Sequence, residues 1–164
     1  VDMALRHAVG KAKAVAKHIK EPVSASTYII GSDQAACVVD HPLIPIGKPG
    51  NRTNAIAQLK HFTSKTVEFH TALAVIHSQS GRLLTYSDVT RVIFRDLSEQ
   101  QIESYVDREK PFDCAGSFKS EGLGIALFEQ INNTDPNALV GLPLIGLCKL
   151  LAEFGEDVLC SQGL

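Results

Sequence analysis

Small and apolar residues recur every three or four positions at the start of the chain, a spacing that predicts a helix from Met3 to about Ile19. Proline at position 22 ends this helix, because proline cannot donate the backbone hydrogen bond that would continue it. The side chains expected on its buried face are Leu5, Ala8, Ala12, Val15, Ala16 and Ile19.

The strand pattern appears as β-branched runs and as alternation of apolar with polar residues. Tyr28–Ser32 predicts a buried strand, which Ala35–Val39 continues or resumes. Thr66–Ser78 and Leu83–Phe94 alternate on either side of a short glycine-containing turn, so they predict the two arms of a long hairpin. A last apolar strand is expected from Leu123 to Ile131.

Three further helices are indicated by their first residues. Asn51 or Thr53 is the expected N-cap of a second helix. Ser98 and the glutamine three residues later form a capping-box pattern for a third, and Pro143 suits the first turn of a fourth. Before the second helix, the chain is expected to turn at Asp40-His41-Pro42 and to form a loop over residues 45–50. Helices alternating with strands predict a mixed α/β domain.

Length and composition indicate one globular domain, 1–164. That domain could itself consist of two lobes. The chain has 164 residues, of which 45% are hydrophobic and 21% charged, and its formal net charge is −2. This balance argues against a domain that binds nucleic acid through its overall field. No apolar run reaches the ~18 residues of a membrane span. We therefore expect neither a nucleic-acid nor a membrane partner.

The cysteines and histidines form no metal-binding motif. Cys37, Cys114, Cys148 and Cys160 are scattered without a C-x-x-C pair, which predicts reduced, mostly buried thiols in a cytoplasmic protein. The chain opens with Val1-Asp2-Met3 and enters a helix almost at once. We therefore expect that it begins inside a domain and lacks an N-terminal segment.

Two short stretches present charged residues in a way that suits chemistry. Asp33 follows a buried β-branched run and Gly31, so its carboxylate is expected at an edge or cleft of the sheet. Taken alone, Asp33 is more simply explained as a turn residue at the end of a strand. Lys48 stands between Gly47 and Pro49, which restrict its loop, and lysine is a common partner for phosphate. The alternative for Lys48 is a solvated loop lysine.

A third stretch, Asp113–Gly122, contains small residues that interrupt a strand-like run. Lys119 and Glu121 alternate to the same side there, so a cation and an anion would project together. Such a pair suits a ligand that carries phosphate and a cationic or donor-rich base. The alternative is an exposed cross-strand ion pair, which would contribute under ~1 kcal/mol.

These stretches together resemble the Maf (septum-formation) family of nucleoside triphosphate pyrophosphatases. The resemblance runs from about Arg6 to Phe154. Its motifs are Ile29-Ile30-Gly31-Ser32-Asp33-Gln34, Gly47-Lys48-Pro49, Cys114-Ala115-Gly116-Ser117-Phe118-Lys119-Ser120-Glu121-Gly122 and Leu139-Val140-Gly141-Leu142-Pro143. Ser-Asp-Gln in the first motif and Lys-Ser-Glu-Gly in the third are similar to the branch of the family that acts on 7-methyl-GTP.

The resemblance implies a fold and a reaction. The fold would be Maf/ITPase-like, an elongated mixed β-sheet flanked by helices, with two lobes around a cleft. The reaction would be hydrolysis of a nucleotide between its α and β phosphates, with Mg²⁺ or Mn²⁺ bridging carboxylate and phosphates. A homodimer is a further expectation, because family members form dimers.

The resemblance also implies a role for each motif residue. Asp33 would be the proton acceptor and a metal ligand. Lys48, Lys119 and Lys11 would bind the polyphosphate, and Gln34 and Glu121 fall at positions associated with substrate choice.

The departure from the family pattern is at the N-terminus. Family members begin with a strand and a Ser-x-Ser-Pro-x-Arg loop that contributes to the phosphate site, and neither is in these 164 residues. The expected domain is therefore truncated at its N-terminus and lacks one strand, so these 164 residues alone are expected to be weakly active or inactive. The alternatives are a pyrophosphatase for dTTP or UTP and a truncated regulatory module that binds nucleotide without turnover.

Overall fold

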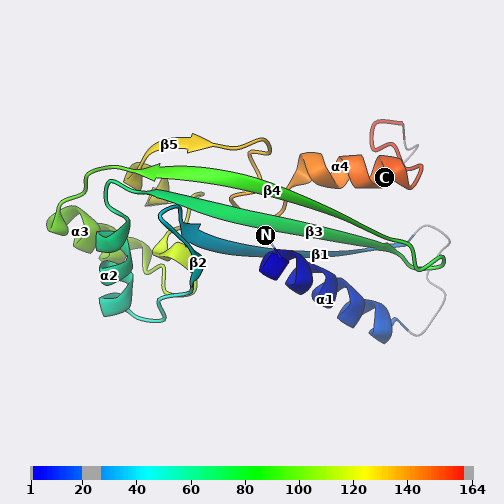
Figure 1. Cartoon of the computed structure of the whole chain (residues 1–164), viewed down its shortest axis with the longest axis horizontal. Coiled ribbons are helices and arrows are strands. Elements are labelled where there is room, and N and C mark those ends of the chain that lie inside the picture. The colour runs from blue at the N-terminus through cyan, green and yellow to red at the C-terminus, as the bar shows by residue number, and fades with distance from the viewer. Residues whose placement is uncertain (1, 20–26, 161–164) are drawn as a thin grey trace. The chain divides into compact units, whose positions relative to one another are not determined.

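The computed structural model describes residues 2–19 and 27–160. In chain order its elements are α1 (Asp2–His18), β1 (Tyr28–Val38), β2 (His41–Ile46), α2 (Arg52–Phe62), β3 (Thr66–His77), β4 (Leu83–Phe94), α3 (Glu99–Glu109), the 3-10 turns η1 (Ala115–Ser117) and η2 (Leu123–Leu127), β5 (Phe128–Asn132) and α4 (Leu144–Glu153) (Figure 1). The mixed α/β class predicted from the sequence is confirmed. None of the helices within the described ranges has the length and apolar character needed to cross a membrane.

The five strands form one sheet in the order β2-β1-β3-β4-β5. β3 and β4 are the arms of the predicted hairpin, and β2 and β5 pair antiparallel with β1 and β4. β1 is also antiparallel to β3, because the Ser78 amide donates to Thr27 at one end and the Val39 amide donates to Thr66 at the other. The expected mixed sheet is therefore wrong for the described strands, whose neighbours all run antiparallel.

β2 is a strand that the sequence pattern missed. We expected a turn at residues 40–42 and a loop from residue 45, but His41–Ile46 pairs with β1, with Cys37 opposite Pro45. Two prolines in this stretch argue against a central strand, and an edge strand tolerates them. The strand is correspondingly exposed, with Leu43 at 93%. Because this edge strand is exposed, its apolar residues do not alternate with polar ones, and the sequence therefore shows no strand periodicity here.

The capping box predicted at Ser98 is confirmed, and of the two N-cap candidates for α2 the structure uses Asn51 rather than Thr53. The Asn51 side chain accepts a hydrogen bond from the Asn54 amide at 2.9 Å and begins α2. Ser98 and Gln101 form a complete capping box at the start of α3. Each cap satisfies backbone N–H groups that have no partner inside the helix.

The chain divides into two compact units, each with its own core. Unit 1 comprises Val1–Gln34, His70–Asp88 and Asp135–Leu164, and unit 2 comprises Ala35–Phe69 and Val89–Thr134. The core of unit 1 includes Leu73, Val75 and Leu150, with Tyr28, Leu84, Tyr86, Leu142, Leu147 and Phe154 packed against it. The core of unit 2 contains an aromatic cluster of Phe62, Phe69, Phe94, Phe118 and Phe128.

Helix α1 packs on β1 through small residues. Its buried side chains are Ala4, Ala8 and Ala12, all 0% exposed, whereas Val15 is 52% exposed. The predicted apolar face is therefore only partly correct. Gly31 of β1 is the reason, because a Cβ there would lie 2.3 Å from the Ala8 carbonyl oxygen. Without a side chain at Gly31, the alanine face of the helix approaches the strand backbone directly.

The segment from Asp113 to Ile131 is less regular than predicted. The strand expected from Leu123 begins only at Phe128, and η2 takes its first five residues. Turns and η1 replace the strand-like run of residues 113–122. The fold here is compact because Gly124 lies against the Lys119 backbone, where a Cβ would be 2.2 Å from the carbonyl oxygen. Such tertiary contacts outweigh the apolar strand pattern.

The close contact at Gly31 predicts a specific sensitivity. Gly31→Ala should lower the free energy of unfolding by about 1–3 kcal/mol, as overpacking typically does, because the added methyl group meets helix backbone. Gly10→Ala on α1 is the matched control, since no atom lies within 4 Å of its Cβ position. Urea unfolding checks both variants. Equal stabilities of the two would contradict the contact.

Candidate functional site

Asp33 lies next to two residues of α1 within unit 1. The Lys11 ammonium donates to Asp33 Oδ1 at 2.6 Å and to the Ser32 carbonyl oxygen at 2.9 Å. His7 Nδ1 is 3.3 Å from the other carboxylate oxygen, Oδ2. The Asp33 side chain is 18% exposed, whereas those of Lys11 and His7 are more than half exposed. A mostly buried carboxylate is thus held between two nitrogen groups.

The structure brings together Lys11 and Asp33, which the sequence had placed in one site only by resemblance. The alanine face of α1 against Gly31 sets this arrangement, because the helix lies close enough for a lysine to reach the strand. His7 is a residue that sequence reasoning missed. Its signal was present, since it stands four residues before Lys11 and therefore on the same face of the helix.

Ser32 and Gln34, on either side of Asp33, are tied to the fourth motif. Ser32 Oγ lies 2.6 Å from the Gly141 carbonyl oxygen. Gln34 Nε2 lies 3.0 Å from the Ala138 carbonyl oxygen and also contacts Leu139 O and Thr71 Oγ1. The first motif thus contacts the backbone of the fourth at the Leu139 and Gly141 carbonyl oxygens. These contacts also use the N–H groups of Gln34, so its free hydrogen-bonding capacity is at Oε1.

Lys48 lies in an exposed loop that is anchored on both sides. Asn54 donates from Nδ2 to the Pro49 carbonyl oxygen at 2.9 Å, and the Gly50 amide donates to Phe112 O at 2.9 Å. Within the described residues, the ammonium group of Lys48 makes no hydrogen bond or ion pair. The backbone of the loop is therefore held while its cation is available to a ligand.

Residues 114–122 are fixed by Phe118, whose ring belongs to the aromatic core of unit 2. On one side of it, Ser117 is 0% exposed and has a positive φ of 60°. On the other side, Lys119 Nζ donates to the Glu109 carbonyl oxygen at 3.0 Å. Glu121 is exposed. The expected strand alternation of Lys119 and Glu121 is wrong, because the chain turns here.

The three predicted residues of unit 2 nevertheless all act electrostatically on one group, the Cys114 thiol. Burial raises the pKa of this thiol above its ordinary value. The nearby positive charge of Lys119 and then that of Lys48 lower it, whereas Glu121 and Asp113 raise it further. Lys48, Lys119 and Glu121 are therefore near enough to influence the same thiol, and with Asp113 they are called the charge cluster of unit 2.

The thiols differ from the sequence expectation. All four cysteines are free, but only Cys37 is buried, and both Cys148 and Cys160 are exposed. Cys148 lies on the exposed side of α4, where its apolar neighbours Leu144 and Ile145 are exposed as well. A mostly buried set of thiols was therefore a wrong prediction.

Asp33 does not belong to a multi-ligand metal cluster of the protein. Across residues 2–19 and 27–160, no group of three histidine, cysteine or carboxylate ligand atoms includes Asp33. A single carboxylate fits magnesium in a different way, since Mg²⁺ is usually bound by one or two carboxylates together with substrate phosphates and water. The donor set thus fits a cation that arrives with a nucleotide.

Comparison with known proteins identifies the family. A family model described as "Maf-like protein" matches residues 1–154. The chain belongs to the Maf family. It is 50% identical over 151 residues to a "7-methyl-GTP pyrophosphatase" of Vibrio vulnificus, which covers 92% of this chain and 74% of that protein. It is 47% identical over 161 residues to a protein of the same name from Polaromonas sp., covering 98% and 70%.

A third relative with this name, from Pseudoalteromonas translucida, is 48% identical over 152 residues, which are 93% of this chain and 71% of that protein. The resemblance drawn from the motifs is thereby confirmed. The Maf motifs fall into two local clusters. Lys11, Asp33 and Gln34 lie in unit 1, and Lys48, Lys119 and Glu121 lie in unit 2. The individual roles of these six residues remain predictions.

The charge cluster of unit 2 can be tested through its thiol. Lys119→Met should raise the pKa of Cys114, because it removes the nearby charge that most stabilises the thiolate, and Glu121→Gln should lower it. The measurement is the pH dependence of Cys114 alkylation, followed by peptide mass spectrometry. Glu129→Gln, an exposed charge loss on β5, is the control. Shifts of the same sign in the Lys119 and Glu121 variants would contradict the cluster.

Proposed function

We propose that this Maf protein hydrolyses 7-methyl-GTP to 7-methyl-GMP and pyrophosphate. The observation that carries the proposal is its 47–50% identity, over more than nine tenths of the chain, to proteins named 7-methyl-GTP pyrophosphatase. The motifs support the same activity, since Ser32-Asp33-Gln34 and Lys119-Ser120-Glu121-Gly122 are the residues expected in the branch of the family that acts on 7-methyl-GTP. We place the protein in the cytoplasm, because its four cysteines are free and thiols stay reduced in that compartment.

Asp33 is assigned as the proton acceptor. It takes a proton from the attacking water as the water oxygen bonds to the α phosphorus. The bond from the α phosphorus to the oxygen that bridges the α and β phosphates breaks, and pyrophosphate leaves. Both carboxylate oxygens already face nitrogen groups at 2.6 and 3.3 Å, but an ionised carboxylate has about four lone-pair sites. The remaining sites can accept from water, while Lys11 and His7 fix the direction in which the carboxylate points.

The lysines supply positive charge where the phosphates need it. Phosphoryl transfer depends mainly on positioning and on stabilising charge on the phosphate oxygens. Lys48 has its ammonium available, and Lys119 uses one donor on the Glu109 carbonyl. Lys11 uses two donors, on Ser32 and Asp33. An ammonium group has three, so Lys11 can orient Asp33 and still contact a phosphate.

Glu121 is assigned to recognition of the methylated base. Methylation at N7 gives guanine a positive charge, and its N1 and N2 groups are hydrogen-bond donors. A carboxylate attracts this base more strongly than a neutral amide would, because bonds to a charged acceptor are stronger. The exposed position of Glu121 leaves its carboxylate accessible. Gln34 would affect substrate choice through Oε1 or through the backbone that it holds.

A divalent cation belongs to this reaction as a partner of the triphosphate. Asp33 is the described carboxylate that would contribute to holding it. When bound, Mg²⁺ or Mn²⁺ neutralises phosphate charge and makes a bound water more acidic.

Pyrophosphate release from a panel of nucleotides tests the proposal. The full-length gene product is incubated with Mg²⁺ and 7-methyl-GTP, GTP, dTTP or UTP. Preferred release from 7-methyl-GTP is expected. Preferred release from dTTP or UTP would replace the substrate, and binding without release from any triphosphate would indicate a nucleotide-binding module instead.

Asp33→Asn should separate chemistry from binding. We expect kcat to fall by at least about 100-fold, which is the lower range for loss of a general base, because the amide cannot accept the water proton. Affinity for a non-hydrolysable 7-methyl-GTP analogue should change little. Asp40→Asn, an exposed residue between β1 and β2, is the matched control. Undiminished turnover in the Asp33 variant would remove this residue from its role.

Glu121→Gln should reduce selectivity for the methylated base. We expect the ratio of kcat/KM for 7-methyl-GTP to that for GTP to fall by about tenfold, equivalent to about 1.4 kcal/mol, because the neutral amide loses the attraction to the cationic base. Glu129→Gln on β5 is the control. A substrate profile identical to that of the unmodified enzyme would rule out the assignment.

A further inference from the structure

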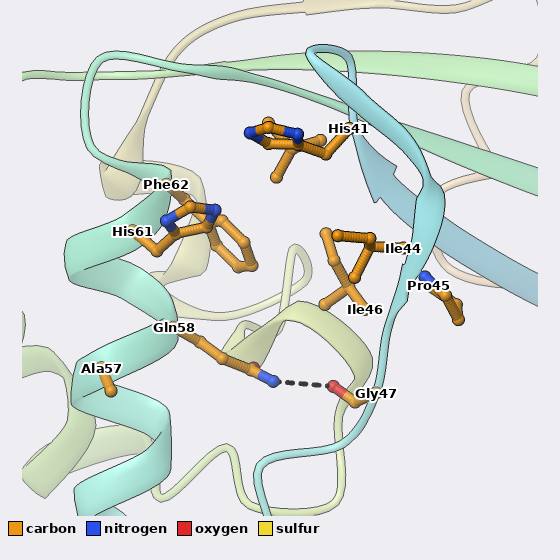
Figure 2. Close-up of a pocket in the computed structure, with 10 residues that line it drawn as sticks. His41, Ile44, Pro45, Ile46, Gly47, Ala57, Gln58, His61 and Phe62 are labelled. Atoms are coloured by element: carbon orange, nitrogen blue, oxygen red, sulfur yellow. Dashed lines mark hydrogen bonds between the residues drawn. The ribbon is translucent and has the colours of Figure 1, made fainter.

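Gln58 of α2 connects the two phosphate-binding motifs of unit 2. Its Nε2 donates to the Gly47 carbonyl oxygen at 3.1 Å, next to Lys48. Its Oε1 accepts from Ser117 Oγ at 2.5 Å, two residues before Lys119. Figure 2 shows the Gln58 side chain extending from α2 to the loop at Gly47. One amide group therefore bonds to both motifs.

The polarity of this bridge is specific to glutamine. The Gly47 carbonyl is only an acceptor, so the group facing it must be an N–H donor. The Ser117 hydroxyl then donates to the other end of the amide. A glutamate at position 58 would place a carboxylate oxygen against the Gly47 carbonyl and lose that bond. A leucine, whose side chain is similar in size, would lose the bonds to both Gly47 and Ser117.

Packing alone does not hold the Lys48 loop on α2. A pocket of about 490 Å³ separates the helix from β2, with His41, Ile44 and His61 among its lining residues (Figure 2). Gln58 and Gly47 also line this pocket. Since the side chains leave a hollow here, the position of the loop depends on hydrogen bonds. Two come from α2, from Gln58 to Gly47 and from Asn54 to Pro49, and the third joins the Gly50 amide to the Phe112 carbonyl oxygen.

The other end of the bridge lies at a constrained backbone. Ser117 is fully buried with a φ of 60°, and Gly116 before it has a φ of 76°. A non-glycine residue in this region costs of order 1–3 kcal/mol and persists only where its surroundings hold it. The bond from Ser117 to Gln58 is such a restraint. It fixes the backbone immediately before Phe118 and Lys119.

We propose that Gln58 is a positioning residue of the nucleotide site, which holds the Lys48 loop and the backbone leading to Lys119 at a set separation for the triphosphate. This inference rests on the proposed function, because it takes both lysines as phosphate ligands. Gln58 itself need not touch the substrate. Its contribution is to reduce the reorganisation that the two cations would otherwise undergo on binding.

The binding test uses inorganic tripolyphosphate as the probe and calorimetry as the measurement. Gln58→Leu and Gln58→Glu in the full-length gene product should each raise the dissociation constant about tenfold. Gln100→Leu, on the exposed face of α3, is the matched control and should leave it unchanged. In a Lys48→Met background, Gln58→Leu should cost only about threefold, because only the bond toward Lys119 is then left to matter. A full tenfold loss in that background would overturn positioning through Lys48.

Hydrogen exchange tests the same inference without relying on catalysis. Gln58→Glu, which is almost the same size as the native residue, should increase amide exchange in residues 46–51. Gln58→Leu should increase exchange both there and in residues 115–119. Unchanged exchange in both segments would overturn the proposal, even if tripolyphosphate does not bind. Absence of 7-methyl-GTP hydrolysis by the unmodified protein would instead refute the proposed function alone.

Discussion

The direct contact between α1 and the backbone of β1 at Gly31 sets the geometry around Asp33. A helix normally stays away from a strand by the thickness of their side chains, but here alanines face a glycine. The short separation allows Lys11 and His7 to reach the carboxylate. Asp33 therefore differs from an ordinary strand-end aspartate through the helix packed beside it, and the same contact accounts for the small residues along α1.

In unit 2 the charged residues are held by an aromatic core and by hydrogen bonds. A cluster of phenylalanine rings holds Phe118, so that Ser117 and Lys119 on either side of it are carried by a rigid core. The Lys48 loop has a hollow beside it and is held by hydrogen bonds from α2. Lys119 is thus supported by a well-packed core and Lys48 by hydrogen bonds. The side chain of Lys48 is exposed while its backbone is held in place.

These arrangements suit a reaction that needs orientation more than covalent chemistry. In phosphoanhydride hydrolysis, a positioned water and a positive environment for phosphate oxygens account for most of the acceleration. Groups held in advance stabilise developing charge without reorganising at the moment of reaction. The bonds of Lys11 to Asp33 and of Gln58 to the Gly47 carbonyl and the Ser117 hydroxyl are restraints of this kind, since each orients another group.

The sequence by itself determined the local features of this protein. It predicted the long hairpin and the caps at Asn51 and Ser98, and it contains the Maf motifs. Strand alternation, helix capping and short motifs each depend on only a few neighbouring residues. Tertiary structure alone decided that Ala4 rather than Val15 lies on the buried face of α1 and that β2 is a proline-containing edge strand. It also placed His7 beside Asp33 within unit 1 and Gln58 beside Gly47 and Ser117 within unit 2. These outcomes depend on the close approach of segments far apart in the chain, a distance that hydrophobic periodicity does not encode.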